Sequence, residues 1–193
     1  MYTVAQKSQG LYKEKGSEFI SFLYPVCSKY QIDEILRQVR KEYFDARHIC
    51  YAYKLDKTEY CTDGGEPSHT AGNPILRQIQ AYKLNNVLLV VIRYFGGTKL
   101  GVPGLIHAYQ SAAQEAIRNN TLVEWQEKQR VKIECSYAQA SIIKNIIRQH
   151  SVEIINSSFE ENCNFLLDIP KEKWFNIQTM LEKYTLKVTI LEK

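Results

Sequence analysis

The sequence has no apolar run long enough to cross a membrane. Its longest purely apolar stretch, Val87–Ile92, ends at Arg93, whereas a spanning helix needs about 20 apolar residues. The opening MYTVAQKSQG also lacks the basic segment and apolar core of a secretory signal. We therefore expect a cytoplasmic protein without a membrane partner.

Paired cysteine motifs are absent too. The five cysteines are odd in number, and no two of them have CxxC spacing, so we expect reduced thiols. Cys61 lies in a polar stretch and is predicted to be the most exposed thiol. A zinc set drawn from His48, Cys50, Cys61 and His69 matches no common zinc spacing, so we expect no metal and no cofactor.

The charge excess is small and uneven. The net charge is +4, and residues 1–123 carry all of it, with 15 Lys and Arg against 11 Asp and Glu. Residues 124–193 hold 10 of each sign. This excess permits contact with nucleic acid without demanding it.

The first part of the chain predicts a mixed α and β domain. Short strands over 9–15 and 18–24 meet at Gly16–Ser17, and a helix capped by Ser28 follows. A strand over 48–55 places Tyr51 and Tyr53 on one face, either as core or as a base-stacking platform, with core preferred. The apolar run over 87–95 is typical of a central strand covered on both faces.

The last part predicts a second domain. Residues 121–127 are expected to be a connector. Apolar periodicity then gives strand, helix, strand, strand, helix and strand, with a strand over 131–137 and a helix led by Pro170. This order is typical of a ferredoxin-like unit. The fold class is therefore α+β, with domains at 1–122 and 128–193.

The first candidate site is a glycine-rich loop. Residues 56–73 lack periodicity, and DGGEPSHTAGNP (63–74) is rich in turn residues. Asn73 is predicted to cap a helix that Pro74 begins. The loop could be a structural turn, a binding loop or an acid–base site using Glu66 and His69. The loop candidates are Asp63, Glu66, His69 and Thr70, together with His107 from the segment that follows the second glycine-rich loop.

A second glycine-rich loop, RYFGGTKLGVPGL (93–105), joins the apolar strand to a helix that Pro103 is expected to open. It fits neither a phosphate-binding P-loop nor a dinucleotide fingerprint, so it is either a generic anion site or a tight connection. Arg93 is predicted to pair with Asp63 or Glu66, because a buried guanidinium needs a carboxylate. The anion-site candidates are Arg77, Arg93, Gly96, Gly97, Lys99 and Gly101.

These two loops carry a family resemblance. DGGEPSHTAGNPIL followed by VVIRYFGGTKLGVPGLIHAYQSAAQEAI resembles the Impact/YigZ family, and residues 128–193 are similar to the second domain of its bacterial members. The likeness is strong over about residues 18–118. It implies a first domain like domain 2 of ribosomal protein S5, and a second like the last, ferredoxin-like domain of elongation factor G.

The resemblance also implies a role in translation. Eukaryotic relatives are translation regulators that compete for an activator of a stress-responsive kinase. Bacterial members are suggested to bind nucleic acid or the ribosome, with no established enzymatic activity. This sequence departs from the family pattern at Pro103, where glycine is usual, and at His107, where arginine is usual. The second change removes a fixed positive charge.

Three functions remain open. The preferred one is a non-enzymatic, translation-associated regulator whose basic glycine loops contact RNA or the ribosome. A protein-interaction module that binds a translation regulator is the second. An enzyme acting on a phosphorylated small molecule, with Glu66 or His69 as acid–base groups, is the third.

Overall fold

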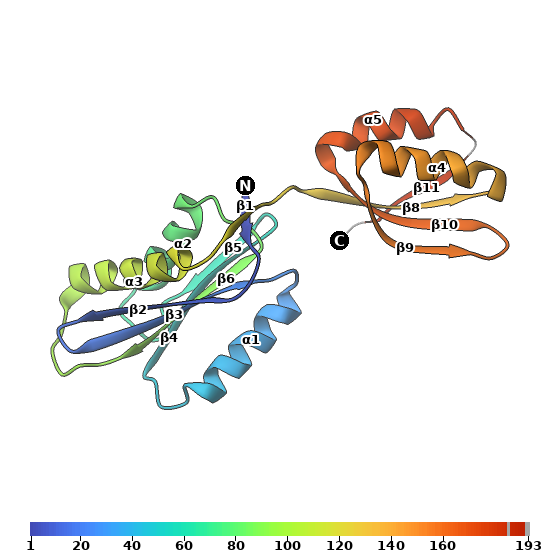
Figure 1. Cartoon of the computed structure of the whole chain (residues 1–193). Coiled ribbons are helices and arrows are strands. Elements are labelled where there is room, and N and C mark those ends of the chain that lie inside the picture. The colour runs from blue at the N-terminus through green and yellow to red at the C-terminus, as the bar shows by residue number, and fades with distance from the viewer. Residues whose placement is uncertain (185, 192–193) are drawn as a thin grey trace. The chain divides into compact units, whose positions relative to one another are not determined.

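The computed structural model describes residues 1–184 and 186–191. The chain divides into two compact units, Met1–Trp125 and Gln126–Lys193, and each unit has its own hydrophobic core (Figure 1). The protein is therefore a mixed α and β chain of two units, and each unit is described separately below.

The first unit is built on a five-stranded sheet in the order β2-β3-β6-β4-β5. All four strand pairs are antiparallel, so the α+β class is confirmed. The strands are β2 (Ser8–Glu14), β3 (Ser17–Pro25), β6 (Val87–Tyr94), β4 (His48–Leu55) and β5 (Thr58–Thr62).

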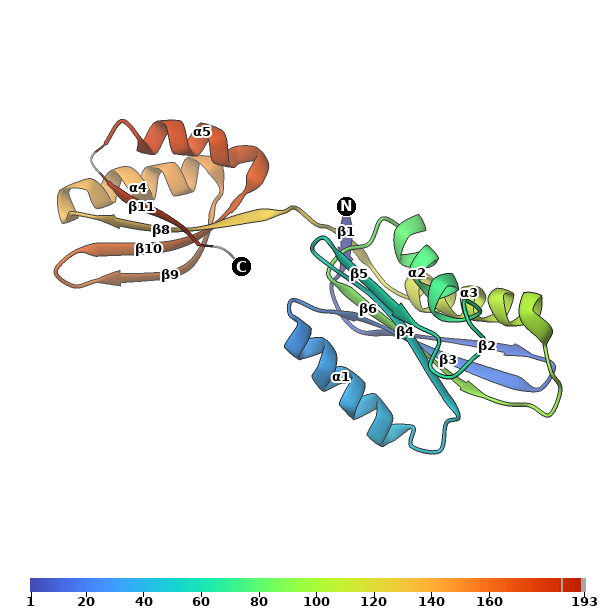
Figure 2. The same cartoon turned by 180° about the vertical axis from the view of Figure 1, so that it is seen from behind.

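Helices cover both faces of this sheet. Helix α1 (Lys29–Glu42) lies on one face, and helices α2 (Gly72–Ala81) and α3 (Gly101–Arg118) lie on the other (Figures 1 and 2). Every residue of β6 before Tyr94 is buried. The prediction of a central strand covered on both faces is thus confirmed, and its physical cause is that both layers bury apolar side chains.

Several local predictions are confirmed. The Ser28 hydroxyl accepts a hydrogen bond from the Gln31 amide at 3.2 Å and caps α1. Gly16 turns between β2 and β3 with a φ of 78°. Tyr53 is buried and Tyr51 packs against the α1 core, which supports the prediction that this strand face belongs to the core.

Three short strands were not predicted. Strand β5 lies inside the stretch expected to be a loop, because an exposed edge strand shows little apolar periodicity. Strand β7 (Leu122–Glu124) lies inside the expected connector and pairs with β1 (Tyr2–Val4) at the chain start. Such pairing between distant segments depends on tertiary structure, so local sequence gives no signal for it.

Three predicted boundaries were wrong. Helix α2 begins at Gly72 after Ala71, and Asn73 does not cap it. Helix α3 begins at Gly101, before Pro103. Tyr137 is the first residue of a helix rather than the end of a strand, because Ser136 forms a capping box with Gln139 just before it.

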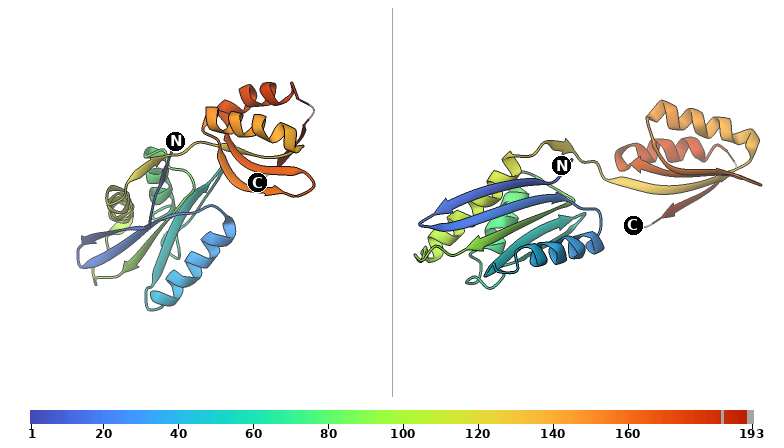
Figure 3. Two further views of the ribbon diagram at one scale, coloured as in Figure 1. Left: turned by 45° about the vertical axis from the view of Figure 1, so that its right-hand side comes forward. Right: turned by 60° about the horizontal axis from the view of Figure 1, so that its bottom comes forward.

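The second unit follows the predicted order of strand, helix, strand, strand, helix and strand. Its antiparallel sheet has the order β11-β8-β10-β9, and α4 and α5 pack on one face (Figure 3). Among the described residues, no helix of the chain is long and apolar enough to span a membrane. The elements are β8 (Lys128–Cys135), α4 (Tyr137–His150), β9 (Glu153–Phe159), β10 (Cys163–Pro170), α5 (Lys171–Leu181) and β11 (Lys187–Leu191).

Candidate functional site

In the first unit, the two glycine-rich loops meet at one end of the sheet, where strands β3 and β4 begin and β6 ends. Strand register places the end of β6 beside the starts of β3 and β4, with Tyr94 opposite Glu18 and Arg93 opposite His48. The β5–α2 loop and the β6–α3 loop both leave from this end. Segments 30 residues apart in sequence thus form one surface.

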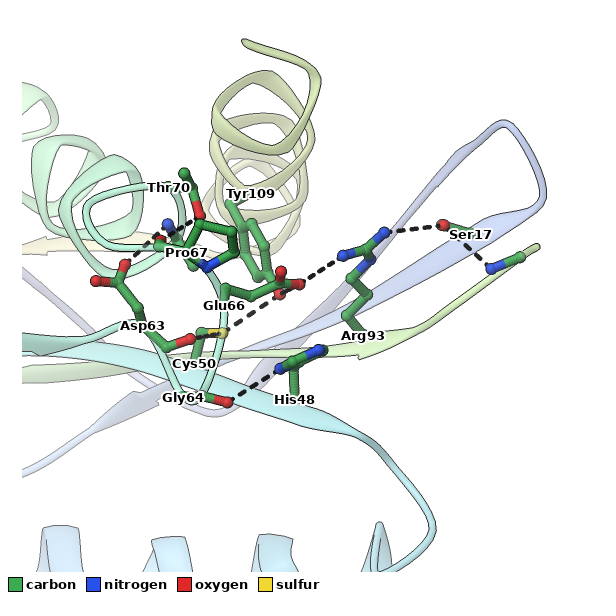
Figure 4. Close-up of polar contacts among 12 residues, drawn as sticks. Ser17, His48, Cys50, Asp63, Gly64, Glu66, Pro67, Thr70, Arg93 and Tyr109 are labelled. Carbon is green, nitrogen blue, oxygen red and sulfur yellow. Dashed lines mark hydrogen bonds and ion pairs between the residues drawn. The ribbon is translucent and has the colours of Figure 1, made fainter. Parts of the chain in front are cut away.

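A buried ion pair joins the loops. Arg93 Nη1 lies 2.7 Å from Glu66 Oε1, and the two side chains are 7% and 3% exposed (Figure 4). The predicted pairing of Arg93 with a carboxylate is therefore observed, and Glu66 is the partner. Breaking such a pair leaves an uncompensated buried charge, so the pair fixes the loop to the strand end.

Arg93 also contacts two aromatic rings. Its guanidinium carbon lies 5.4 Å from the Phe19 ring centre and 5.6 Å from that of Phe95. Nη2 donates to the Ser17 hydroxyl at 3.4 Å, while the buried Nε has no hydrogen-bond partner among the described residues. Cation–π contacts of this kind orient the guanidinium.

Tyr109 and Cys50 extend the buried polar cluster. The Tyr109 hydroxyl donates to Glu66 Oε1 at 2.9 Å, and the Cys50 thiol lies 3.3 Å from that hydroxyl. Burial raises the pKa of the Cys50 thiol to about 12, and burial together with Cys50 and Glu66 raises the pKa of Tyr109 well above its ordinary value. Both groups therefore stay protonated near neutral pH, and Cys50 is not an activated nucleophile.

Asp63 has a capping role. Its carboxylate accepts hydrogen bonds from the backbone amides of His69, Ala71 and Gly72 at 2.8–3.0 Å. Burial acts to raise the pKa of Asp63, but these three bonds outweigh it and hold the pKa below its ordinary value. The free amides at the start of α2 are therefore bonded by a carboxylate from the preceding loop, and not by Asn73 as predicted.

Close backbone contact explains one glycine of the second loop. A side chain built on Gly96 would lie 1.8 Å from the Gly16 carbonyl carbon, so the loop rests directly on the β2–β3 turn. Gly97 differs, because its φ is 88° and a side chain there would meet nothing within 4 Å. Gly96 is thus a packing requirement, and Gly97 leaves an open surface.

A shallow depression of about 310 Å³ opens beside the ion pair. Arg47 and Lys99 line it, both are exposed, and neither forms an ion pair within the part of the chain that the structure describes. Glu66 already neutralises Arg93. The depression therefore presents uncompensated positive charge. Its lining residues are Arg47, His48, Gly65, Glu66, Pro67, Arg93, Phe95 and Lys99.

Several predicted residues lie outside this depression. Arg77 is on the exposed side of α2, and His107 on α3 contacts Tyr12 of β2 with ring centres 5.9 Å apart. Buried Thr70 donates to the Pro67 carbonyl at 2.7 Å. His69 is exposed, and its Nδ1 lies 2.9 Å from the Asn73 amide nitrogen. Gly101 begins α3 with a φ of 71°.

Sequence reasoning missed Arg47, Phe95 and Tyr109. Arg47 directly precedes β4 and Phe95 directly follows β6, so the antiparallel register of these strands brings them to the same end of the sheet. Tyr109 belongs to the buried apolar stripe of α3, so periodicity alone indicates a core position. A signal for Arg47 existed, namely a cation at a strand start, but it became informative only once the strand order was known.

The exposed cysteine is not the predicted one. Cys61 is half-buried, with its thiol 3.2 Å from Asn73 Oδ1, and Cys27 is the exposed cysteine instead. The prediction for Cys61 was wrong because β5 carries it into a sheet. Across the described ranges 1–184 and 186–191, no three His, Cys, Asp or Glu side chains are grouped to hold a metal ion.

Comparisons with known proteins place the site in a family context. The Impact N-terminal domain matches residues 15–117, and a domain of unknown function (DUF1949) matches residues 133–185. The IMPACT family member YigZ of Escherichia coli (strain K12) is 31% identical over 164 residues, or 82% of this chain and 80% of YigZ. Protein IMPACT of Homo sapiens is 30% identical over 115 residues, or 55% of this chain and 35% of that protein.

One solved structure matches the whole chain. It is described as the crystal structure of a hypothetical protein, with a TM-score of 0.72 at 27% identity, and the match covers 100% of this chain and 97% of the other. The two-unit architecture is therefore shared with a known fold. Because the Impact N-terminal domain spans more than half of the chain and YigZ matches most of it, this protein belongs to the Impact family.

Proposed function

We propose that this protein is a non-enzymatic, translation-associated regulator that contacts RNA, free or in the ribosome, through the depression of its first unit. The observation that carries this proposal is the pair of exposed cations, Arg47 and Lys99, on one depression without an ion-pair partner among the described residues. Unpaired cations on a concave surface attract phosphate groups.

The surroundings of the two cations support an anion as the ligand. The only acidic side chain that lines the depression within the described residues is that of Glu66, and it is 3% exposed and paired with Arg93. The open space at Gly97 lets a ligand approach the backbone next to Lys99. Positive charge in the depression therefore occurs together with access to the backbone of the loop that carries Lys99.

Family membership supports the link to translation. The resemblance implies translation regulation for the eukaryotic relatives. The part of this chain that the Impact N-terminal domain matches, residues 15–117, contains every residue lining the depression. The proposed contact thus lies in the domain that gives the family its name.

The same geometry argues against the hypothesis of an enzyme that uses Glu66 or His69 as an acid–base group. Glu66 receives hydrogen bonds from Arg93 and Tyr109 and is almost fully buried, which leaves it poorly placed to exchange a proton with a substrate. His69 is exposed and bonded to Asn73 rather than to an acidic partner. Neither residue forms an acid–base arrangement with the other in the described contacts.

The test is binding of ribosomes and of RNA at low and high salt. Each phosphate contact on a single strand contributes about −0.7 to the slope of log K against log salt, so two contacts predict roughly sevenfold weaker binding between about 50 and about 200 mM salt. Arg47→Ala and Lys99→Ala should each reduce the slope by about 0.7. Co-sedimentation with ribosomes and anisotropy with labelled RNA measure both effects.

Lys57→Ala is the matched control. Lys57 is exposed and lies in the β4–β5 turn, at the opposite end of the same sheet, so this variant loses one charge without touching the depression. Arg77→Ala then asks whether α2 adds to the contact. Binding that does not depend on salt, or equal losses for Lys57→Ala and Lys99→Ala, would contradict the proposal.

A second candidate function is a protein-interaction module, and helix α1 favours it. Tyr30 at its start and Phe44 just beyond its end are 76% and 82% exposed. Exposed aromatic side chains are frequent anchors of protein interfaces. The test is a pull-down from nuclease-treated lysate. A regulator that is recovered with Lys99→Ala but lost with Tyr30→Ala and Phe44→Ala would favour this function over RNA contact.

We further propose that the two units adopt the folds implied by the resemblance. In the second unit, taking its strands in chain order as one to four, the sheet order is four, one, three, two, in keeping with a split βαβ unit. For the first unit, the fold implied by the resemblance is that of domain 2 of ribosomal protein S5. Superposition on those domains tests both assignments.

A further inference from the structure

We propose that the Phe95 ring is a platform on which one unpaired RNA base stacks, so that the depression binds single-stranded RNA in preference to duplex. This inference rests on the RNA contact proposed above and names the kind of RNA. It starts from the position of Phe95, which directly follows the central strand β6 and lines the depression together with Arg47 and Lys99.

Phe95 is unusual for a residue that continues a buried strand. The seven residues Val87–Arg93 are all buried, whereas Phe95 is 50% exposed. Scattered exposed apolar residues are ordinary, so exposure alone does not indicate a ligand. Its neighbours make the difference, because two cations without ion pairs share the same depression.

The Phe95 ring contacts a cation whose position is fixed. The Arg93 guanidinium lies 5.6 Å from the ring centre and is itself fixed by Glu66, Ser17 and the Phe19 ring. A ring that is already oriented loses little conformational freedom when a ligand stacks on it. Phe95 is therefore a half-exposed aromatic ring with an ordered cation beside it, and its exposed surface is available to a base.

The cations supply the rest of a single-strand site. Proteins that bind single-stranded nucleic acid combine positive charge along the backbone with aromatic rings on which bases stack. Arg47 and Lys99 line the same depression as Phe95, so they can contact phosphates of a strand whose base stacks on Phe95. A duplex keeps its bases stacked on one another and offers none to a ring on the protein surface.

Shielding of the ion pair is the alternative role for Phe95. A large apolar side chain over Arg93 keeps water from the Arg93–Glu66 pair, and leucine would do so nearly as well. Stacking on a base needs an aromatic ring. Phe95→Leu therefore removes stacking and keeps most of the apolar cover, while Phe95→Trp keeps both.

The experiment compares the full-length wild type, Phe95→Leu and Phe95→Trp by fluorescence anisotropy. The probes are a labelled single-stranded RNA of about 12 nucleotides and the duplex of the same length. We expect Phe95→Leu to bind the single strand about five- to 150-fold more weakly and the duplex as the wild type does. Phe95→Trp should bind the single strand at least as tightly as the wild type.

The outcomes separate this inference from the proposed function. Circular dichroism and urea titration first establish that each variant is folded. Unchanged single-strand binding by folded Phe95→Leu, or equal affinity of the wild type for both probes, overturns the stacking platform while RNA contact stands. If the wild type binds neither probe nor ribosomes at any salt concentration, both proposals fail.

Discussion

One surface of each unit offers a comparison of how cations are paired. On the face of the second unit's sheet that carries no helix, basic side chains of β8 and β11 are paired. Arg130 makes two contacts of 2.8 Å with Asp168, and Lys132 and Lys187 share Glu134 at 2.7 and 3.0 Å. In the first unit, Arg47 and Lys99 border the depression without ion-pair partners in the described part of the chain.

This comparison shows that the number of charges does not locate a binding site. Both units are rich in ions, and exposed ion pairs contribute little to stability. What differs between these two surfaces is whether a cation already has a carboxylate partner. Unpaired cations beside an aromatic ring remain available to a ligand, so we place function on the first unit.

Loss of the buried Arg93 should have the largest effect. Arg93→Met leaves Glu66 buried without a counter-ion, and we expect the free energy of unfolding to fall by about 3–5 kcal/mol. Lys128→Met removes a partner of Glu153 on the surface of the second unit and should cost less than about 1 kcal/mol. Urea denaturation followed by circular dichroism measures both values. Similar losses for the two variants would remove the distinction between buried and surface pairs.

Gly96→Ala should have the next largest effect, because the new side chain would collide with the backbone of Gly16. We expect a loss of about 1–3 kcal/mol and weaker RNA binding, since the loop that carries Lys99 must move. In Gly97→Ala the new side chain meets open space, so only the positive φ destabilises the variant, and we expect the free energy of unfolding to fall by about 1–2 kcal/mol. If Gly96→Ala leaves both stability and binding unchanged, the loop is not held by this contact.

Capping offers a third comparison between the units. Asp63→Ala removes the acceptor of three amide hydrogen bonds and should cost about 1–2 kcal/mol at pH 7, and Ser136→Ala in the second unit about 1 kcal/mol. The folded-state pKa of Asp63 is depressed, so its charge-dependent contribution is present above the unfolded value of about 3.9 and is lost as pH falls through the folded value.

The pH profile checks this assignment. Urea titrations of wild type and Asp63→Ala across the acidic range should converge as pH falls below about 4, whereas the difference between wild type and Ser136→Ala should not change with pH. A constant difference for Asp63→Ala would show that the carboxylate charge contributes nothing to the cap.

The smallest effect is expected for His107→Arg, which restores the residue usual in the family. His107 contacts Tyr12 and lies 3.7 Å from Glu14 rather than lining the depression. The salt slope of RNA binding should therefore change by less than the value of about 0.7 that Lys99→Ala removes. A rise of that size would extend the binding surface to the β2 side of α3.

Much of the fold could be predicted from local patterns. The helix after Ser28, the central strand before Arg93 and the order of elements in the second unit all follow from periodicity and caps. The short strands β1, β5 and β7 could not, because pairing with distant segments creates them. The Asp63 cap was missed because its carboxylate lies six to nine residues before the three amides it binds.

The sequence by itself determined the two glycine-rich loops, the need of Arg93 for a carboxylate and the surplus of positive charge in the first part. Composition and spacing hold this information, since glycine and charge restrict local chemistry wherever the chain goes. Only the tertiary structure decided that Glu66 is the partner of Arg93 and that Arg47 and Phe95 join Lys99. The physical reason is strand register, which brings the end of β6 beside the start of β4.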